Sequence, residues 1–205
     1  MVNAAGRYDA TFKITTSTDM SELRACRHKY QTLRRNTFSL AEEEFLRATL
    51  LRIDITTIDE VALAVIGSDW TKHQRRAEFD WEHEILPVMR KSHPRGLDMA
   101  IWCQGTLCGV AVARLSDAKT WLSLTYLEGS PVPGRPLKKQ VTPVVITAME
   151  IYASQVQLHD EQKRLPIVRI MRPLPEVLAN YGSIGYDVVH AEKAGGKRFE
   201  YLINN

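Results

Sequence analysis

The sequence predicts an α/β fold of a single domain, in which a mixed and mostly antiparallel central sheet carries helices on both faces. Three observations point to this fold class. Several short stretches alternate between apolar and polar residues, as strands with one buried face do. Longer amphipathic stretches separate them, and several begin with N-capping residues. The 205 residues are 44% hydrophobic and 25% charged, which is enough apolar material for one ordinary core.

An opening strand and a long helix are expected at the N-terminus. Residues 8–15, "YDATFKIT", alternate between apolar and polar side chains, as a strand does. Ser17 or Thr18 is placed to cap the helix that follows. That helix is expected to end near Arg35.

Two more helices are expected before the main run of strands. "SLAEEEFLRATLLR" combines Ser39 as N-cap with Glu42 in the third helical position, the pattern of a capping box. The β-branched run behind it fits a strand as well as a helix, and a helix from Ile58 is favoured. The charged and aromatic residues 68–93 then predict one amphipathic helix that is kinked by Pro87 and ends before the next proline.

From Leu97 onward the pattern predicts antiparallel strands and a buried helix. "LDMAIWCQGTLCGVAVARLS" has two apolar runs around a Gly-containing turn, the pattern of a β-hairpin, and "TWLSLTYLEG" alternates as the next strand. After a Pro/Gly loop, "LKKQVTPVVITAMEIYASQ" predicts a helix packed against the sheet. "LPIVRIM" is expected to be a short strand, residues 173–181 a short helix, and "GYDVVHA" and "KRFEYLIN" the closing strands.

This order of elements, with these turn residues, resembles the GNAT superfamily of acyl-CoA-dependent N-acyltransferases. "KITTSTDMSEL" is similar to the family's opening strand and first helix, and "AIWCQGTLCGVAVARL" is similar to its hairpin. "NYGSIGYDVV" is similar to the family's Asn-to-Tyr helix, which is followed by Gly-aromatic at the next strand. The likeness covers most of the single domain 1–205, and residues 38–66 look like a helical insertion.

The resemblance implies an enzyme that transfers an acyl group, with acetyl-CoA as the expected donor, to an amine of a small molecule or a protein. In this family the strand before the long helix splays from its neighbour, and the turn into the helix binds the CoA pyrophosphate. Unpaired amides and the helix dipole make such a turn favourable for phosphate. The resemblance also implies that the backbone of Tyr126 and Leu127 pairs with the pantetheine arm.

The expected phosphate turn is "GRPLKKQV", residues 134–141. Arg135 matches the first position of the family's Gln/Arg-x-x-Gly-x-Gly/Ala motif, but Lys138 and Gln140 replace its glycines, so close backbone approach is not guaranteed. The two lysines could neutralise phosphates directly instead. The phosphate-binding residues implied here are Arg135, Leu137, Lys138, Lys139 and Gln140, with a solvated helix start as the alternative.

Two residues are candidates for the chemistry. N-acyl transfer needs a neutral amine and a proton for the departing thiolate. Glu128 ends a predicted strand just before the phosphate loop and could act as base or position a water, although most glutamates in such places are only solvated. Tyr181 falls on the family's frequent general-acid tyrosine, and packing with a bonded hydroxyl is its alternative.

The segment "TKHQRRAEFDWEHE" is the candidate for acceptor binding, because in this family the second helix and its loop border the acceptor pocket. The expected acceptor-binding residues are Phe79, Trp81 and Glu82, and Trp81, Glu82 and Glu84 would suit a cationic amine. The basic residues before them would suit nucleic-acid phosphates. A solvated face with two core aromatics explains the same string.

Composition restricts location and partners. The formal charge of +3 is dispersed, so nucleic acid is neither required nor excluded as a partner, and it is not favoured. Three cysteines without a C-x-x-C pair fit a reducing compartment, hence the cytoplasm. No run of eighteen apolar residues suggests a membrane span. The three histidines in 73–93 are ten residues apart, so no zinc site is expected.

A non-enzymatic alternative stays open. Because Lys138 and Gln140 replace the motif's glycines, the chain could be a catalytically inactive GNAT-shaped module that binds a protein or nucleic-acid partner. A modifier of nucleic acid on the same fold is a third option, motivated by residues 72–81. A homodimer is conceivable through the C-terminal strand, since exposed strand edges pair readily.

Overall fold

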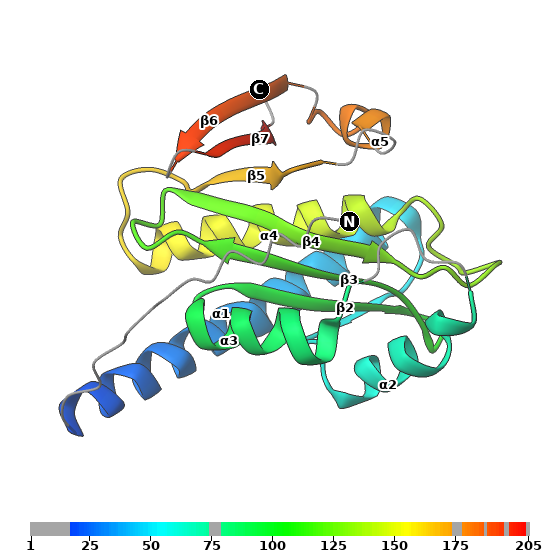
Figure 1. Ribbon diagram of the computed structural model, residues 1–205, viewed down its shortest axis with the longest axis horizontal. Coiled ribbons are helices and arrows are strands. Elements are labelled where there is room, and N and C mark those ends of the chain that lie inside the picture. Colours follow the sequence, from blue (N-terminus) through cyan, green and yellow to red (C-terminus); the bar gives the residue numbers. More distant parts are fainter. Residues whose placement is uncertain (1–16, 74–78, 174–177, 187, 195–196, 204–205) are drawn as a thin grey trace.

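The fold is built on one seven-stranded sheet with strand order β1-β2-β3-β4-β5-β7-β6 (Figure 1). The structure is a computed structural model that describes residues 17–73, 79–173, 178–186, 188–194 and 197–203. Neighbouring strands are antiparallel except for β4 and β5, which are parallel. The expected α/β class with a mixed, mostly antiparallel sheet is therefore confirmed. The strands are β1 Asp54–Thr56, β2 Leu97–Cys103, β3 Thr106–Leu115, β4 Trp121–Gly129, β5 Ile167–Met171, β6 Val188–Ala194 and β7 Lys197–Ile203.

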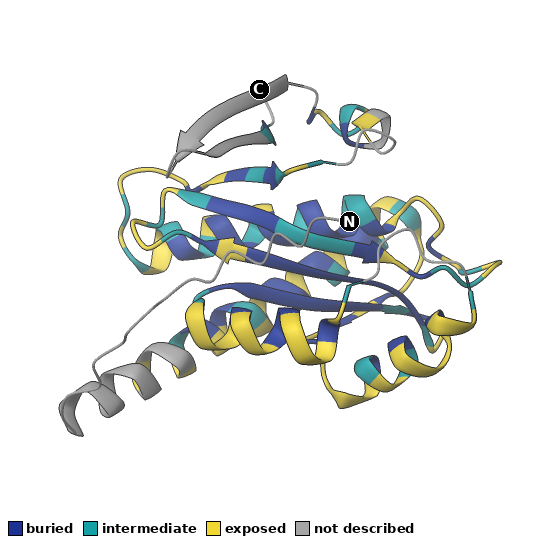
Figure 2. Ribbon diagram, in the orientation of Figure 1, coloured by how far each residue is buried: buried dark blue, intermediate teal, exposed yellow. Residues whose placement is uncertain are grey.

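Helices cover both faces of this sheet, and each face has its own core. On one face, α1 (Ser17–Thr49) and α4 (Val141–His159) pack on the strands. On the other face lie α2 (Glu60–Ser68), α3 (Leu86–Ser92) and the π-helical turn Trp81–Ile85 directly before α3. The short helix α5 (Leu178–Gly182) follows β5. Figure 2 shows the result: β2 and β3 are buried almost throughout, while α2 and α3 expose their outer sides.

The central hairpin forms as predicted because its turn residues accept left-handed backbone. Gln104 and Gly105 have φ of 52° and 75°, which suits the tight turn between β2 and β3. β4 and α4 also lie where the sequence predicts them. Pro143 is near the first turn of α4, where a missing amide hydrogen costs little.

The N-terminal helices differ from the prediction. One continuous helix, α1, replaces the two helices expected on either side of Ser39, so the predicted capping box does not start a helix. No glycine or proline interrupts this stretch, and buried apolar side chains continue through it at helical spacing. Glu42 instead accepts a hydrogen bond from the amide of Ile55, 2.6 Å away, and so ties α1 to β1. The strand expected over residues 8–15 lies outside the described residues.

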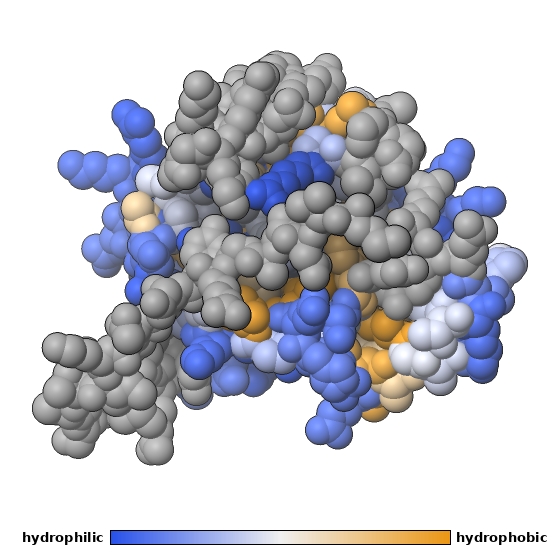
Figure 3. Space-filling view, viewed as in Figure 1, coloured by the Kyte–Doolittle hydropathy of each residue, from blue (hydrophilic) through white to orange (hydrophobic). Residues whose placement is uncertain are grey.

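The segment 38–66, predicted to be a helical insertion, contains the end of α1, the short β1 and most of α2. The helix favoured from Ile58 begins at Glu60, and the carboxylate of Asp59 caps it by accepting from the amide of Ala62, 2.9 Å away. The single-domain organisation stays a prediction. Hydrophobic surface gathers over α2 in Figure 3, where Val61 is 61% exposed, because "EVALAVIGS" has few polar residues for its outer side.

The single long helix predicted over residues 68–93 is wrong. A short 3₁₀ turn, Trp70–Lys72, comes first, and the π-helical turn and α3 follow after Asp80. Asp80 starts the π-helical turn by accepting from the amide of His83, 2.8 Å away. Pro87 lies in the first turn of α3, which tolerates proline, directly after the π-helical turn. Among the described helices, none is both long and apolar enough to span a bilayer.

Candidate active site at the strand splay

The central feature of the candidate site is the place where β4 separates from β5. The two strands pair in parallel over residues 121–124 of β4 and 167–170 of β5. β4 continues to Gly129 along β3, and in the described part of the chain β5 does not pair with it beyond Leu124. The register between β3 and β4 shifts at Thr125, and such a bulge bends a strand. One backbone edge of β4, residues 125–129, therefore has no paired strand on the side of β5 in the described chain, and we call the region between the two diverging strands the wedge.

Glu128 lies near the end of this open segment and is buried. It is opposite Val110 of β3, and only 6% of its surface is exposed. One carboxylate oxygen accepts a hydrogen bond of 2.7 Å from the indole nitrogen of Trp81. The alternative of a merely solvated glutamate at a strand end does not hold, because a side chain in this position has been taken out of bulk water.

Two aromatic rings contact the tryptophan that binds Glu128. Phe79, Trp81 and Tyr126 contact one another edge to face, with ring centroids 5.3 to 6.3 Å apart. The π-helical turn positions Trp81, and such turns often occur at functional sites. Glu82, predicted beside them, is instead exposed on the outer side of that turn.

Tyr181 lies on α5, which follows β5 at the same end of the sheet. Because β4 and β5 are parallel, their carboxyl ends share one edge, and Figure 1 shows α5 above that edge. The side chain is buried, with 7% exposure, and burial raises the pKa of its phenol. Among the described residues none hydrogen-bonds this hydroxyl. The phenol stays protonated at neutral pH.

The turn "GRPLKKQV" joins β4 to the N-terminus of α4 beside the splay. Leu137 is fully buried and anchors the turn, whereas Lys138, Lys139 and Gln140 are exposed. Lys139 has φ of 68°, a left-handed conformation that glycine adopts more easily. The amide of Gln140 donates to the carbonyl of Leu137, 3.0 Å away, so it is already used within the turn.

Arg135 and α4 are both held close to the end of β4. The guanidinium of Arg135 lies over Gly129, since a Cβ added there would be 3.8 Å from Nη2. Gly109 of β3, which pairs with Gly129, permits the start of α4 to sit on the sheet: an added Cβ would be 2.3 Å from a methyl of Val141. Pro143 contributes no amide, so Val141 and Thr142 supply the first-turn amides of this helix.

The structure thus brings together some predicted site residues and separates others. Glu128, Trp81, Phe79 and Tyr126 form one cluster, and Arg135 lies at the end of the same strand. The basic cluster expected beside the aromatics falls partly on 74–78, outside the described residues. Lys72 is exposed and paired with Asp69, 3.0 Å away.

Sequence reasoning missed two partners at this site. The hydrogen bond between Trp81 and Glu128 joins positions 47 residues apart, and no local pattern specifies it. Gly109 was visible only as a glycine within the hairpin, and a small residue next to a buried helix start is the hint that could have found it. The thiols of Cys103 and Cys108 flank the hairpin turn as buried free cysteines, and burial raises both pKa values.

Solved structures of acetyltransferases are similar to the chain. An Escherichia coli ribosomal-protein alanine N-acetyltransferase is 14% identical over 74% of this chain and 90% of its own, with a TM-score of 0.46. The PaiA N-acetyltransferase of Thermoplasma acidophilum, in complex with coenzyme A, is 14% identical over 76% of this chain and 100% of its own, with a TM-score of 0.44. A Bacillus subtilis acetyltransferase in complex with CoA is 12% identical over 76% and 98%, with a TM-score of 0.43.

No protein-family model matches the sequence, and no curated protein matches it either. The fold assignment therefore rests on the chain's own geometry. The chain has a mixed sheet with one parallel strand pair in its described part and a splay after that pair. A long helix connects the two strands of the pair. These features agree with what the resemblance implies. The chain has a GNAT-like fold.

Proposed function

We propose that the protein is an N-acyltransferase that moves an acyl group from acyl-CoA to an amine, with acetyl-CoA as the donor. The observation that carries this proposal is the open edge of β4 with the buried Glu128 near its end. An extended chain can add to an open strand edge through main-chain hydrogen bonds, and the pantetheine arm of CoA has two amides for this purpose. The backbone of Tyr126 and Leu127 lies in the open segment and is the proposed partner of that arm.

The phosphates of CoA would bind at the turn into α4. The positive end of the helix dipole and the first-turn amides favour an anion there. Arg135 can reach it from its place over Gly129, and the exposed Lys138 and Lys139 add positive charge. Leu137 and Gln140 act through the backbone, with Leu137 fixing the turn in the core.

The proposed chemistry divides between the two sides of the wedge. Glu128 accepts a proton from the acceptor ammonium, directly or through a water, and the neutral amine attacks the thioester carbonyl. The C–N bond forms, the C–S bond breaks, and Tyr181 donates its phenolic proton to the departing CoA thiolate. The surplus proton on the new amide nitrogen leaves through water and restores the phenol. The indole N–H of Trp81 holds one oxygen of Glu128 and so orients the carboxylate.

The acceptor would approach past the aromatic cluster of Phe79, Trp81 and Tyr126. Aromatic faces together with a buried carboxylate favour a cationic amine. Glu82 is exposed nearby in sequence and would act at long range on the approach of that cation. The acceptor can be a small molecule or a protein side chain, and the buried free thiols are consistent with work in the cytoplasm.

The first experiment is a melting curve of the full chain with millimolar acetyl-CoA, CoA or ATP as control nucleotide. A ligand that binds only the folded state raises the melting temperature by mass action, so a shift with both CoA species and none with ATP is expected. The second candidate function, an inactive GNAT-shaped binding module, is favoured by the strained Lys139 and the missing amide of Pro143. The absence of any CoA shift would replace the enzyme proposal with this module.

A further inference from the structure

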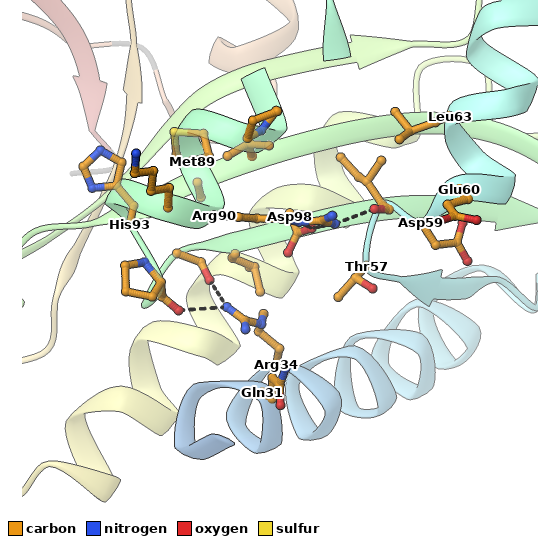
Figure 4. A pocket seen from close by; sticks show the side chains of 18 of the residues that line it. Gln31, Arg34, Thr57, Asp59, Glu60, Leu63, Met89, Arg90, His93 and Asp98 are labelled. Carbon is orange, nitrogen blue, oxygen red and sulfur yellow. Dashed lines mark hydrogen bonds and ion pairs between the residues drawn. The ribbon is translucent and has the colours of Figure 1, made fainter. Parts of the chain in front are cut away.

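A cavity of about 950 Å³ lies away from the splay, beside the first residues of β2 (Figure 4). β1 pairs with β2 only at residues 100–102, so the start of β2 extends beyond its neighbour. α1, the segment 57–63 and α3 wall the cavity, and β2 and β3 form its floor. As described, its lining includes no residue of β4, β5, α4 or α5, so it is separate from the proposed acyl-transfer site.

Arg34 of α1 lines this cavity with an uncompensated charge. Its Nη1 donates to the carbonyl oxygens of Pro94 and Gly96, 3.2 and 2.7 Å away. Its Nε is buried without a hydrogen-bond partner, and in the described part of the chain no carboxylate pairs with the guanidinium. A buried donor without a partner is costly and rare in folded proteins. The missing partner has the chemistry of an anion, such as a carboxylate.

The second arginine in the lining, Arg90, differs from Arg34 because its charge is paired. Arg90 of α3 forms an ion pair with Asp98 of β2, 2.6 Å apart, and also donates to the carbonyl of Ile58. These contacts neutralise Arg90 and fix α3 against β2 and the segment before α2. Figure 4 shows the two arginines entering the cavity from different helices. The contacts of Arg90 therefore hold this wall of the cavity in place. Of the two arginines, only Arg34 has no acidic partner among the described residues.

An acidic end lies across the cavity, at the start of α2. Asp59 and Glu60 line the wall there (Figure 4). Asp59 uses one oxygen to cap α2, whereas Glu60 is exposed and, among the described residues, in no ion pair. Apolar side chains of Leu63, Met89 and Leu97 complete the lining. The cavity thus offers a cation, an apolar surface and a carboxylate to one small molecule.

We propose that this cavity binds a small zwitterion of the ω-amino-acid class, with its carboxylate on Arg34, its aliphatic body on the apolar lining and its ammonium at Asp59 and Glu60. The proposal does not depend on acyl transfer. A carboxylate supplies the counter-ion that the guanidinium of Arg34 lacks among the described residues, and a charge-assisted hydrogen bond is stronger than a neutral one. An ω-amino acid separates its two charges by an aliphatic body, as the cavity separates Arg34 from Asp59 and Glu60, whereas the charges of an α-amino acid are adjacent.

The test is calorimetric titration of the full chain with three probes: ε-aminocaproate, caproate, which lacks the ammonium, and hexylamine, which lacks the carboxylate. ε-Aminocaproate is expected to bind, and each truncated probe should bind about tenfold more weakly or worse, as loss of one charged hydrogen bond implies. Arg34→Gln should weaken the zwitterion by a similar factor, while Arg35→Gln, on the exposed neighbour, should leave binding unchanged.

Glu60→Gln keeps the test decisive if Arg34→Gln lowers the stability of the fold, because Glu60 is exposed and holds no structural contact in the described chain. It should weaken ε-aminocaproate severalfold and leave caproate unaffected, and Glu43→Gln on α1 is its control. The proposal is overturned if ε-aminocaproate gives no heat, if caproate binds as tightly, or if neither cavity variant changes binding.

Discussion

Two buried carboxylates stand at opposite ends of the α4 segment, and their surroundings differ in kind. Glu128 lies at the splay near the start of α4 and accepts from a neutral indole N–H. Asp160, directly after α4, lies among Lys29, Lys119 and the hydroxyl of Tyr30. Lys29 and Tyr30 come from α1, and Lys119 comes from the turn between β3 and β4. The cations around Asp160 join elements, whereas the described contact of Glu128 with an orienting N–H near an open edge suits a group that exchanges protons.

The pKa of Asp160 follows from this arrangement. Burial would raise it, but hydrogen bonds from Lys119 and Lys29, together with their charges, outweigh burial and lower the pKa to about 2. Such a group stays ionised at every pH at which an enzyme normally works. The comparison therefore separates a catalytic role, expected for Glu128, from a structural role, expected for Asp160.

The largest expected effect is on turnover in Glu128→Gln. Loss of the proton acceptor should lower kcat about 10²- to 10⁴-fold, the usual range for a general base. The melting temperature should hold, because glutamine is nearly isosteric and its amide oxygen can still accept from Trp81. Steady-state kinetics with an accepted amine and a melting curve measure the two quantities. Activity within a few-fold of wild type would refute the catalytic role.

Tyr181→Phe should have the next largest effect. Removing the proton donor for the thiolate is expected to lower kcat about 10- to 100-fold without changing the KM for acyl-CoA. Tyr186→Phe is the matched control, since the hydroxyl of Tyr186 donates to Glu150, 3.1 Å away, on the α4 side. Equal losses of kcat in the two variants would show that Tyr181 only packs.

Asp160→Asn should lower stability and leave turnover unchanged, the opposite of what we expect for Glu128→Gln. We expect the free energy of unfolding to fall by about 2 kcal/mol, because two partly exposed lysines lose their buried partner, and kcat to stay the same. Chemical denaturation measures the change, with the exposed Asp117→Asn as control. An unchanged midpoint would remove the structural role.

The stabilisation from the contact between Asp160 and its lysines should decrease as the pH falls. A carboxylate whose pKa is lower in the folded than in the unfolded chain contributes stability above its ordinary value of 3.8 and loses it as pH falls toward about 2. The difference in stability between wild type and Asp160→Asn should therefore be constant near neutrality and shrink between these two values. Denaturation midpoints measured across that range check this, and a gap that widens in acid would contradict it.

The smallest effect is expected at the exposed Lys138. Lys138→Gln should raise the KM for acyl-CoA about two- to fivefold and reduce its salt dependence, because an exposed charge acts on phosphates through screened solvent. The kcat should not change. Lys163→Gln, beyond the far end of α4, is the control. A loss of kcat at Lys138 would mean that the turn positions the thioester as well as the phosphates.

The sheet was largely predictable, because its signals are local. Alternation marks β4, and a Gly-containing turn between apolar runs marks the β2–β3 hairpin. The helices of the N-terminal half were harder. Ser39 and Glu42 form a capping-box pattern inside a continuous helix, since burial of the apolar stripe on either side outweighs a local cap.

The residues of the candidate site also differ in whether a local sequence signal marks them. Glu128 and Tyr181 could be located because a strand end and a helix end mark them in the sequence. The burial of Glu128 could not be predicted, because it depends on Trp81 arriving from a π-helical turn on another segment. Arg34 gave no signal either, since its environment comes from the loop at Pro94 and Gly96. Contacts between distant segments decide such features, and no local pattern records them.

The splay also bears on how the sheet avoids unwanted partners. An open strand at the rim of a sheet can recruit a strand from another molecule, which leads to aggregation. Here the open edge of β4 lies within the sheet and not at its rim, because β4 and β5 pair at residues 121–124. Paired strands lie about 4.8 Å apart, so a wedge that narrows to this spacing has room for one thin extended chain and none for a second sheet. The same opening that would admit one linear ligand therefore leaves no room for a second sheet.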